Sequence, residues 1–345
     1  MARRPGMAAL AAAAGVSVAT VDRALNGREQ VAADTRTRIA EAAQRIGHPA
    51  AWRLHGSGPA PGRTLRFGVV LHKQGQDFYR AFAQELERAI AEIPGLRGEL
   101  VLEFSASQAP SDMAASLRAM AGRCDVLAAT AVNHPEITAA VEELRGTGLP
   151  VIALLSDFAL GLRAGYLGLD NLKIGRSAGW ITALSARATG AAQGKVMLVV
   201  GGHRWHGHEL REAGFRSYLR EIAPGLEVLP TFVNLETRQL TQDAVRVALA
   251  RHPDLRGIYV AGGGMEGAIA ALRAHRDPSA VSLVVSALTP ESRRGLADGL
   301  VTMVTDTPLE RLCRQLFGQM ARLVQDNADF GEIFLLPEIH IGESV

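Results

Sequence analysis

The chain has 345 residues, which is enough for two or three domains. Hydrophobic residues make up 48% of it and charged residues 21%, so the composition excludes an intrinsically disordered protein and indicates a globular one. The formal net charge of +2 is nearly balanced, and no apolar run reaches the ~18 residues that a membrane-spanning helix needs.

Residues 7–26 predict two short helices, because apolar residues recur in each at helical spacing. Gly15 lies where the chain leaves the first helix, a position that favours positive φ, and Ser17 follows as an N-cap. Two such helices joined by a glycine turn are typical of a helix-turn-helix, whose second helix enters the DNA major groove with its N-terminal residues at the base edges. The residues expected to read bases are Val18, Ala19, Thr20 and Arg23.

The stretch 14–26, AGVSVATVDRALN, resembles the lactose-repressor family of bacterial transcription regulators, whose headpiece has the form AGVSxxTVSRxLN. It departs from that form at Asp22, where a serine is usual. The resemblance implies that Val18, Ala19 and Arg23 contact bases. The two apolar side chains can only contact groups such as a thymine methyl, so hydrogen-bonded reading falls on Arg23, which can pair bidentately with guanine.

The same N-terminal stretch has a second interpretation. A basic start followed by an alanine-rich run also fits a secretory signal peptide, and the chain would then be an exported periplasmic solute-binding protein of a sugar transporter. However, Ser17, Thr20 and the Asp22-Arg23 pair interrupt the apolar run, and a further amphipathic helix follows. These features favour the DNA-binding interpretation.

Basic charge gathers in the same part of the chain. Residues 1–55 hold eight arginines against four acidic residues, as an electrostatic footprint for DNA requires. Residues 31–47 predict a third helix with one apolar face, ended by Gly47 in the C′ position. The DNA-binding domain is expected over residues 1–48.

A hinge or linker is expected at residues 49–64, because Gly, Ser and Pro dominate residues 56–62. The family resemblance implies a hinge helix here that wedges a leucine into the DNA minor groove. Leu54 is the candidate, although the segment is shorter than usual and carries Trp52. The expected DNA-binding residues are Ser17, Val18, Ala19, Thr20, Arg23, Asn26 and Leu54.

From residue 65 the pattern changes to strands that alternate with helices of 10 to 15 residues, which predicts parallel sheets built from right-handed βαβ units. This alternation of strands and helices begins again at Asn171, which predicts two α/β lobes in series. The predicted fold is an all-α helix-turn-helix headpiece followed by a two-lobed α/β ligand domain with doubly wound parallel sheets. The predicted strands are 65–71, 100–104, 126–129, 151–155, 195–200, 227–232, 257–260 and 282–285. The predicted helices are 78–93, 112–121, 136–146, 171–188, 209–222, 241–250 and 265–274.

Residues 65–345 resemble the ligand domain of the same repressor family and the type I periplasmic sugar-binding proteins. The resemblance implies one lobe of about 65–169 with 307–333, and a second of 170–306 with 334–345. It is carried by three matches in the same order as in the family: Tyr166–Asn171 with Gly175, Arg176, Ala178 and Gly179; Glu209–Phe215; and Ala287–Pro290 with Asp306–Pro308.

A ligand is expected at the carboxyl ends of the parallel strands, where two sheet edges would face each other across a cleft. The resemblance assigns sugar contacts to Arg211 and Asp306 and to aromatic side chains near residue 78. Leu155 and Ala287 stand where sugar-binding relatives often have aspartates, and the neighbouring Ser156-Asp157 pair can substitute. The expected ligand-binding residues are Asp77, Phe78, Tyr79, Ser156, Asp157, Arg211, Gly263 and Asp306.

No metal, cofactor or catalytic function is expected. His203, His206 and His208 lie close in sequence, but no carboxylate or cysteine completes a metal-binding set at ligand spacing. The glycines at 262–264 lack both the GxGxxG spacing and a P-loop lysine. Neither a nucleophile elbow nor an ordered triad is present.

Two well-separated cysteines, Cys124 and Cys313, fit reduced buried thiols and a cytoplasmic location. The expected function is that of a transcriptional regulator, a repressor, acting as a homodimer on double-stranded operator DNA without contact with a membrane. The expected effector is a sugar, a polyol or a sugar derivative.

Overall fold

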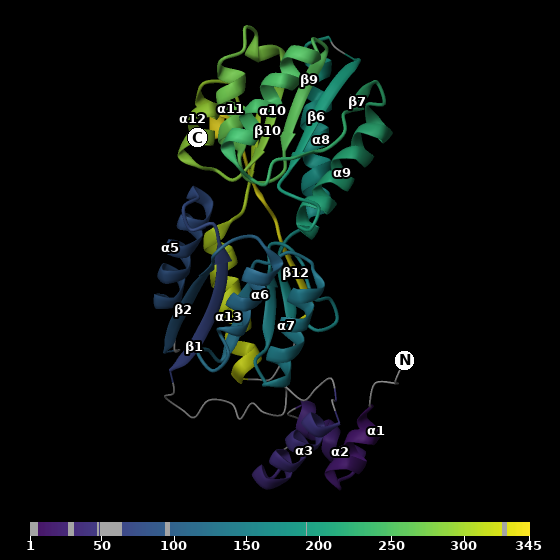
Figure 1. Cartoon of the computed structure of the whole chain (residues 1–345), viewed down its shortest axis with the longest axis vertical. Helices are drawn as coiled ribbons and strands as arrows, with labels where there is room; N and C mark the ends of the chain where they lie inside the picture. Colours follow the sequence, from purple (N-terminus) through teal and green to yellow (C-terminus); the bar gives the residue numbers. More distant parts are fainter. Residues whose placement is uncertain are drawn as a thin grey trace. The chain divides into compact units, whose positions relative to one another are not determined.

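The computed structural model describes residues 6–26, 31–46, 48, 64–93, 97–190, 192–325 and 330–345. Figure 1 shows the order of its elements. The chain divides into two compact units, Met1–Leu167 with Leu309–Ile333 and Gly168–Pro308 with Phe334–Val345.

Three helices form the N-terminal headpiece: α1 (Met7–Ala14), α2 (Val18–Asn26) and α3 (Ala33–Arg45). Gly15 has φ of 64°, and the Thr20 amide donates to Ser17 Oγ at 3.1 Å, so the predicted glycine turn and N-cap are confirmed. The predicted end of the third helix, Gly47, lies outside the described residues. Ten buried side chains make a core of their own: Leu10, Ala11, Ala14, Val21, Ala24, Leu25, Ile39, Ala40, Ala42 and Ala43.

Two arginines of α3 hold this helix against the end of α1. Arg38 Nη2 donates to the Ala14 carbonyl at 3.0 Å, and Arg45 Nη2 donates to the Ala13 carbonyl at 2.9 Å. The last carbonyls of a helix have no partner within it, so these cations satisfy them and complement the helix dipole. Part of the basic charge of the headpiece is therefore structural.

A test for membrane-spanning helices finds no single helix of sufficient length and hydropathy among the described residues. Only α1 and α2 taken together pass it, and they are bent by 104° at the break between them. In the structure these two helices are the arms of the helix-turn-helix.

The first unit is built on a six-stranded sheet with strand order β12-β5-β4-β3-β1-β2, in which the pairs from β5 to β2 are all parallel. Helix α5 packs against α13, and α6 packs against α7. Both cysteines are buried in this unit, and burial raises the pKa of Cys124 to about 12. The strands are β1 (Leu65–His72), β2 (Gly98–Ser105), β3 (Val126–Ala129), β4 (Val151–Leu154), β5 (Gly165–Leu169) and β12 (Glu332–Leu335). The helices are α5 (Asp77–Ala91), α6 (Pro110–Arg118), α7 (Pro135–Gly146) and α13 (Leu309–Gln325).

The second unit has a seven-stranded sheet with the order β13-β11-β10-β9-β6-β7, and β8 also pairs with β6. Only β13 is antiparallel to its neighbour, β11, among the described pairs. The strands are β6 (Gly194–Val200), β7 (Leu226–Val228), β8 (Phe232–Val233), β9 (Leu255–Val260), β10 (Ser282–Ser286), β11 (Met303–Asp306) and β13 (Glu338–His340). The helices are α8 (Asn171–Ala188), α9 (His206–Ile222), α10 (Arg238–Arg251), α11 (Met265–Arg273) and α12 (Pro290–Ala297).

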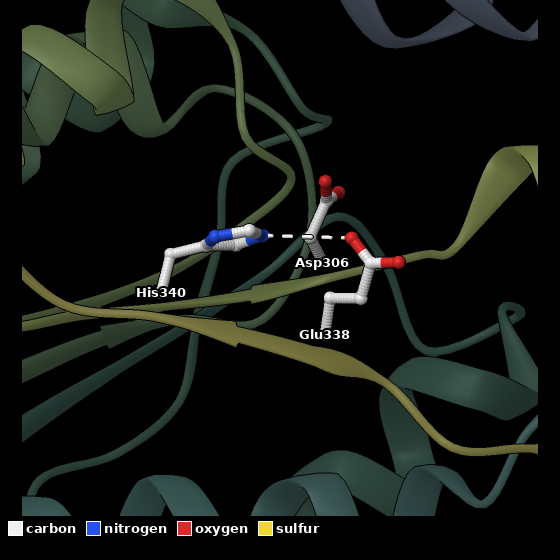
Figure 2. Close-up of side chains that lie close together, drawn as sticks. All are labelled: Asp306, Glu338 and His340. Atoms are coloured by element: carbon white, nitrogen blue, oxygen red, sulfur yellow. Dashed lines mark ion pairs between the residues drawn. The ribbon is translucent and has the colours of Figure 1, made fainter. Parts of the chain in front are cut away.

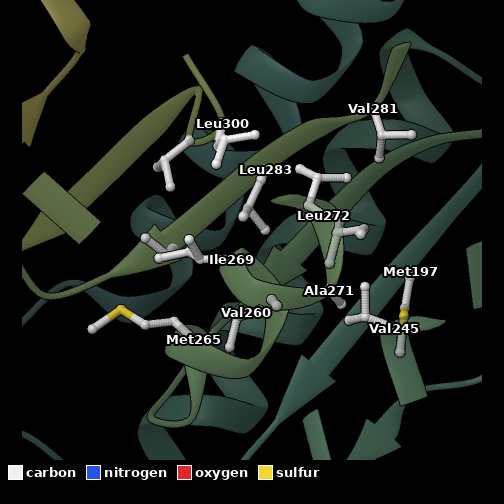
Figure 3. Packing of buried hydrophobic residues seen from close by; sticks show 14 of the residues in the cluster. Met197, Val245, Val260, Met265, Ile269, Ala271, Leu272, Val281, Leu283 and Leu300 are labelled. Atoms are coloured by element: carbon white, nitrogen blue, oxygen red, sulfur yellow. The ribbon is translucent and has the colours of Figure 1, made fainter. Parts of the chain in front are cut away.

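Two hydrophobic clusters cover the two faces of this second sheet. One cluster joins strand residues to the helices α10, α11 and α12 (Figure 3). The other joins residues of the same strands to α8 and α9. Alternate residues of β6 and β9 enter different clusters, so helices cover both faces, as the doubly wound prediction requires.

The structure contains elements that the prediction lacks, namely strands β11, β12 and β13 and helices α12 and α13, and it differs at two further strands. The predicted strand 227–232 is two short strands, β7 and β8, on either side of Pro230, which has no amide hydrogen for a sheet. Strand β5 was not predicted, because two glycines interrupt its apolar pattern.

Candidate DNA-binding and ligand-binding sites

The exposed start of α2 is the candidate DNA-binding surface. Ser17, Val18 and Ala19 are exposed, and Val18 keeps 45% of its surface in solvent. The hydroxyls of Ser17 and Thr20 share a hydrogen bond of 2.8 Å. The headpiece core takes residues from the other face of α2, so the helix presents the predicted readers away from the core.

Arg23 belongs to the same surface. It is only partly buried, and its Nε donates to the carbonyl of Ala19 at 3.2 Å, which draws the guanidinium back along α2 towards the predicted readers. Asn26 is the last residue of α2, and its side chain lies outside the described residues. Leu54 also lies outside them, so its assignment to the minor groove stays a prediction.

Arg211 on α9 lies at the carboxyl edge of the second sheet. Its Nη1 donates to the carbonyl of Ala261, directly after β9, at 2.7 Å, and to Ser286 Oγ, at the end of β10, at 3.0 Å. Its Nε donates to Asn171 Oδ1 at 2.8 Å. Among the described residues no partner occupies Nη2. The guanidinium is therefore fixed at the edge where α/β sheets bind ligands, with one amino group left for a ligand.

Two glycines bring α9 close enough to α8 to fix Arg211. A Cβ on Gly175 would lie 2.0 Å from the Arg211 carbonyl oxygen, and a Cβ on Gly214 would lie 2.1 Å from the Leu172 carbonyl oxygen. Real Cβ atoms do not approach so closely, so only glycine permits this contact between the two backbones. Both glycines belong to the segments that carry the family resemblance.

The buried Glu236 and the partly buried His208 form an acid–imidazole pair at the same edge, which the sequence did not predict. The Gly201 amide donates to His208 Nδ1 at 3.2 Å, and His208 Nε2 faces Glu236 Oε1 at 3.7 Å. Glu236 is 8% exposed and has φ of 54°, as does the preceding Leu235 at 50°. Non-glycine residues with such φ cluster at ligand sites.

Gly263 is enclosed by the same loop. Its amide donates to Glu236 Oε1 at 3.2 Å, and its carbonyl accepts from Asn234 Nδ2 at 2.8 Å. Both backbone groups therefore have internal partners. Contact between Gly263 and a ligand stays a prediction. The Gly263 amide orients the Glu236 carboxylate.

Leu155 and Ala287, where the family resemblance predicts aspartates, are both left-handed, with φ of 61° and 70°. Each follows directly after a strand, β4 and β10. The predicted substitute Ser156 is buried, while Asp157 is bound bidentately by Arg163, at 2.5 Å and 2.7 Å. Since the Arg163 side chain is only 7% exposed, Asp157 serves first as its counter-ion.

The start of α5 carries the three residues predicted in the first unit. Asp77 pairs with Arg80 one turn along the helix. Phe78 is partly exposed, whereas Tyr79 is 9% exposed and shares a hydrogen bond of 2.7 Å with His72 Nε2. Phe78 is thus the aromatic side chain that remains open to a ligand at this position.

Asp306 ends β11 in the second unit. Burial raises the pKa of its carboxyl above the usual value, and hydrogen bonds from the amides of Leu288 and Thr307 oppose this shift. The three histidines near residue 206 do not meet: His203 is exposed, His206 pairs with Glu209 at 3.3 Å, and His208 faces Glu236.

Comparison with known proteins gives two family matches. Residues 7–49 match the model of bacterial regulatory proteins of the lacI family, and residues 67–328 match a periplasmic binding protein domain. A search of curated proteins finds no match.

Several solved structures share the fold of the two units. GanP, a glucose-galactose binding protein from Geobacillus stearothermophilus, has a TM-score of 0.72 at 19% identity, with 82% of this chain and 99% of that chain covered. A transporter solute-binding protein from Agrobacterium vitis with bound α-D-tagatopyranose has 0.73 at 17%, covering 81% and 95%. One from Bacillus halodurans C-125 with bound myo-inositol has 0.70 at 16%, covering 82% and 96%. At these identities the similarity shows the fold alone.

Proposed function

Because the chain belongs to the lacI family of bacterial regulatory proteins and carries a periplasmic binding protein domain, we propose that it is a repressor released or engaged by a small polar ligand. The observation that carries this proposal is the exposed start of α2, in a headpiece whose own core is separate from both sheets. An exported solute-binding protein has no use for a DNA-reading helix, so the headpiece favours the regulator over the transporter component.

In this proposal the protein acts in the cytoplasm as a homodimer. A pseudo-palindromic operator presents two equivalent half-sites, and a dimer places one α2 in each. The ligand shifts DNA affinity only by binding one arrangement of the chain more tightly than the other. A ligand-binding rather than a catalytic role agrees with the two families that the chain matches.

The proposed ligand is a sugar, a polyol or a sugar derivative. Arg211 offers a fixed donor, Glu236 an acceptor oriented by Gly263, and Asp306 a second acceptor, all at the carboxyl ends of strands in one sheet. Adjacent hydroxyl groups suit such pairs of charged donors and acceptors. The similar structures that contain tagatopyranose and myo-inositol support this class of ligand.

Replacing Arg23 by alanine tests the DNA-reading assignment. We expect operator affinity to fall by ~1 to 3 kcal/mol and preference at one base pair of each half-site to relax, because a bidentate contact with guanine is lost. Operators selected from a random DNA library and a competition assay with variants of each base pair measure both effects. Equal losses on operator and random DNA would instead assign Arg23 to a phosphate.

Ionic strength tests the electrostatic part of binding. Each phosphate contact contributes about −0.9 to the slope of log affinity against log salt concentration, so several arginine contacts give a steep decline. Fluorescence anisotropy of a labelled operator over a salt series measures the slope. A flat response would contradict the proposed DNA-binding surface. Arg38 and Arg45 should contribute little, since their guanidinium groups bind the end of α1.

A further inference from the structure

Three side chains with metal-binding atoms lie together on β11 and β13. In this antiparallel pair Asp306 is opposite Glu338, and Val304 is opposite His340. Residues 338 and 340 are two apart, so Glu338, His340 and Asp306 share one face of the sheet. Their ligand atoms lie within 4.8 Å of one another (Figure 2).

Within the described residues no lysine or arginine balances the charges of this cluster. Two carboxylates directly opposite each other on neighbouring strands repel. In the described part of the chain neither Asp306 nor Glu338 forms an ion pair with lysine or arginine, and the only cationic candidate is His340, whose Nε2 lies 3.7 Å from Glu338 Oε2. A cation placed between the three side chains would remove this repulsion.

His340 gives a second, independent indication. Its Nε2 is buried and has no hydrogen-bond partner among the described residues. An unpaired buried polar atom is costly, and native proteins satisfy nearly all of them. Because Nε2 points towards the Glu338 carboxylate and an Asp306 ligand atom lies within 4.8 Å, a bound cation would satisfy the imidazole lone pair as well as the acids (Figure 2).

We propose that Asp306, Glu338 and His340 bind a divalent transition-metal ion of the Zn²⁺ type. Two carboxylates and a neutral imidazole match the charge of such an ion, and imidazole favours zinc and its neighbours over Mg²⁺ or Ca²⁺. This site shares no residue with the proposed DNA-binding surface, but it shares Asp306 with the proposed ligand site.

The ligand atoms need only a small movement to meet around one ion. Zinc takes carboxylate oxygen and imidazole nitrogen at about 2.0 to 2.2 Å in tetrahedral geometry, so its ligand atoms lie closer together than the present separations. The side chain of Glu338 is 53% exposed and can rotate towards the other two. Water completes the fourth position, as in other sites with three protein ligands.

Titration of the full-length protein with Zn²⁺ tests the proposal. The protein is first treated with a chelator and dialysed, and binding is measured by calorimetry. We expect one saturable ion per chain, and both His340→Gln and Glu338→Gln should weaken it by about tenfold or more, because each removes one of three ligands. His203→Gln is the matched control, since this exposed histidine lies outside the cluster, and it should bind Zn²⁺ as the wild type does.

Two further measurements decide between the outcomes. Circular dichroism shows whether each variant is folded, and Glu338→Gln, which changes an exposed side chain, is the variant expected to fold normally. A wild-type protein that takes up no ion, or a folded Glu338→Gln protein with wild-type Zn²⁺ affinity, would overturn the proposal. Operator binding is measured on the same samples, so failure of the metal site is distinguishable from failure of the proposed DNA-binding function.

Discussion

Replacing Ile39 by alanine should abolish operator binding while the two sheets and the helices that cover them remain folded. Ile39 is fully buried in the headpiece core, and removing three carbons from such a position costs about 2 to 5 kcal/mol. A domain of about 40 residues has a free energy of unfolding of only about 2 to 6 kcal/mol. The substitution therefore removes most or all of the stability of the headpiece, and α2 loses the support that presents it.

The measurement is fluorescence anisotropy with a labelled operator, together with limited proteolysis that reports which part of the chain is unfolded. Ile39→Val is the matched control: it removes one carbon, costs about 0.5 to 1.5 kcal/mol, and should keep operator binding. We expect Ile39→Ala to be cleaved within residues 6–46 and to bind ligand normally. Wild-type operator affinity in this variant would show that the headpiece core does not support the DNA-binding surface.

Most of the fold was predictable because fully buried parallel strands are continuous apolar runs. Strands β3 and β4 are buried along their whole length, and their predicted limits agree with the structure to within one residue. Strand β5 could not be recognised in this way. Its first residue, Gly165, packs under the ring of Phe330, where a Cβ would come within 2.6 Å, and a pattern of neighbouring residues contains no trace of that contact.

For the ligand-binding candidates, the sequence predicts single residues but not the partners that the fold brings to them. The family resemblance predicts Arg211, and the structure gives it three fixed partners at a sheet edge. The pair of Glu236 and His208 was missed because these residues are 28 positions apart and only the ends of β6 and β8 bring them together. Its position after a strand predicts Asp157, but no sequence pattern predicts its bidentate partner Arg163.

The cluster of Asp306, Glu338 and His340 could not be predicted from the sequence for the same reason. Asp306 and Glu338 are 32 positions apart, and only the antiparallel register of β11 and β13 places them opposite each other. The histidines at 203, 206 and 208 are close in sequence, but His203 is exposed, His206 pairs with Glu209 and His208 faces Glu236. Spacing identifies a metal site only when its ligands lie within one local element.

Changing Arg211 to lysine should weaken ligand binding by ~1.5 to 3 kcal/mol, or about 10- to 150-fold, the usual range for a charge-assisted hydrogen bond. Lysine keeps the charge and one donor, but it lacks the planar fork that bonds Asn171, Ala261 and Ser286 at once. The alanine variant is less informative, because it would leave the buried Ala261 carbonyl without a partner and destabilise the second unit.

A thermal-shift screen of sugars, polyols and sugar acids on the wild-type protein identifies the ligand for this experiment. A ligand at 100 times its Kd raises the free energy of unfolding by ~2.7 kcal/mol, which the screen detects as a higher melting temperature. Calorimetry then compares Arg211→Lys with Arg216→Lys, a control on the same helix whose guanidinium bonds Glu212 and Thr231. Operator binding without ligand should stay at the wild-type level in both. If ligand releases the repressor, cells with Arg211→Lys should stay repressed at ligand concentrations that induce the wild type. Wild-type ligand affinity in Arg211→Lys, or loss of ligand-free operator binding in the folded variant, would remove Arg211 from the ligand site.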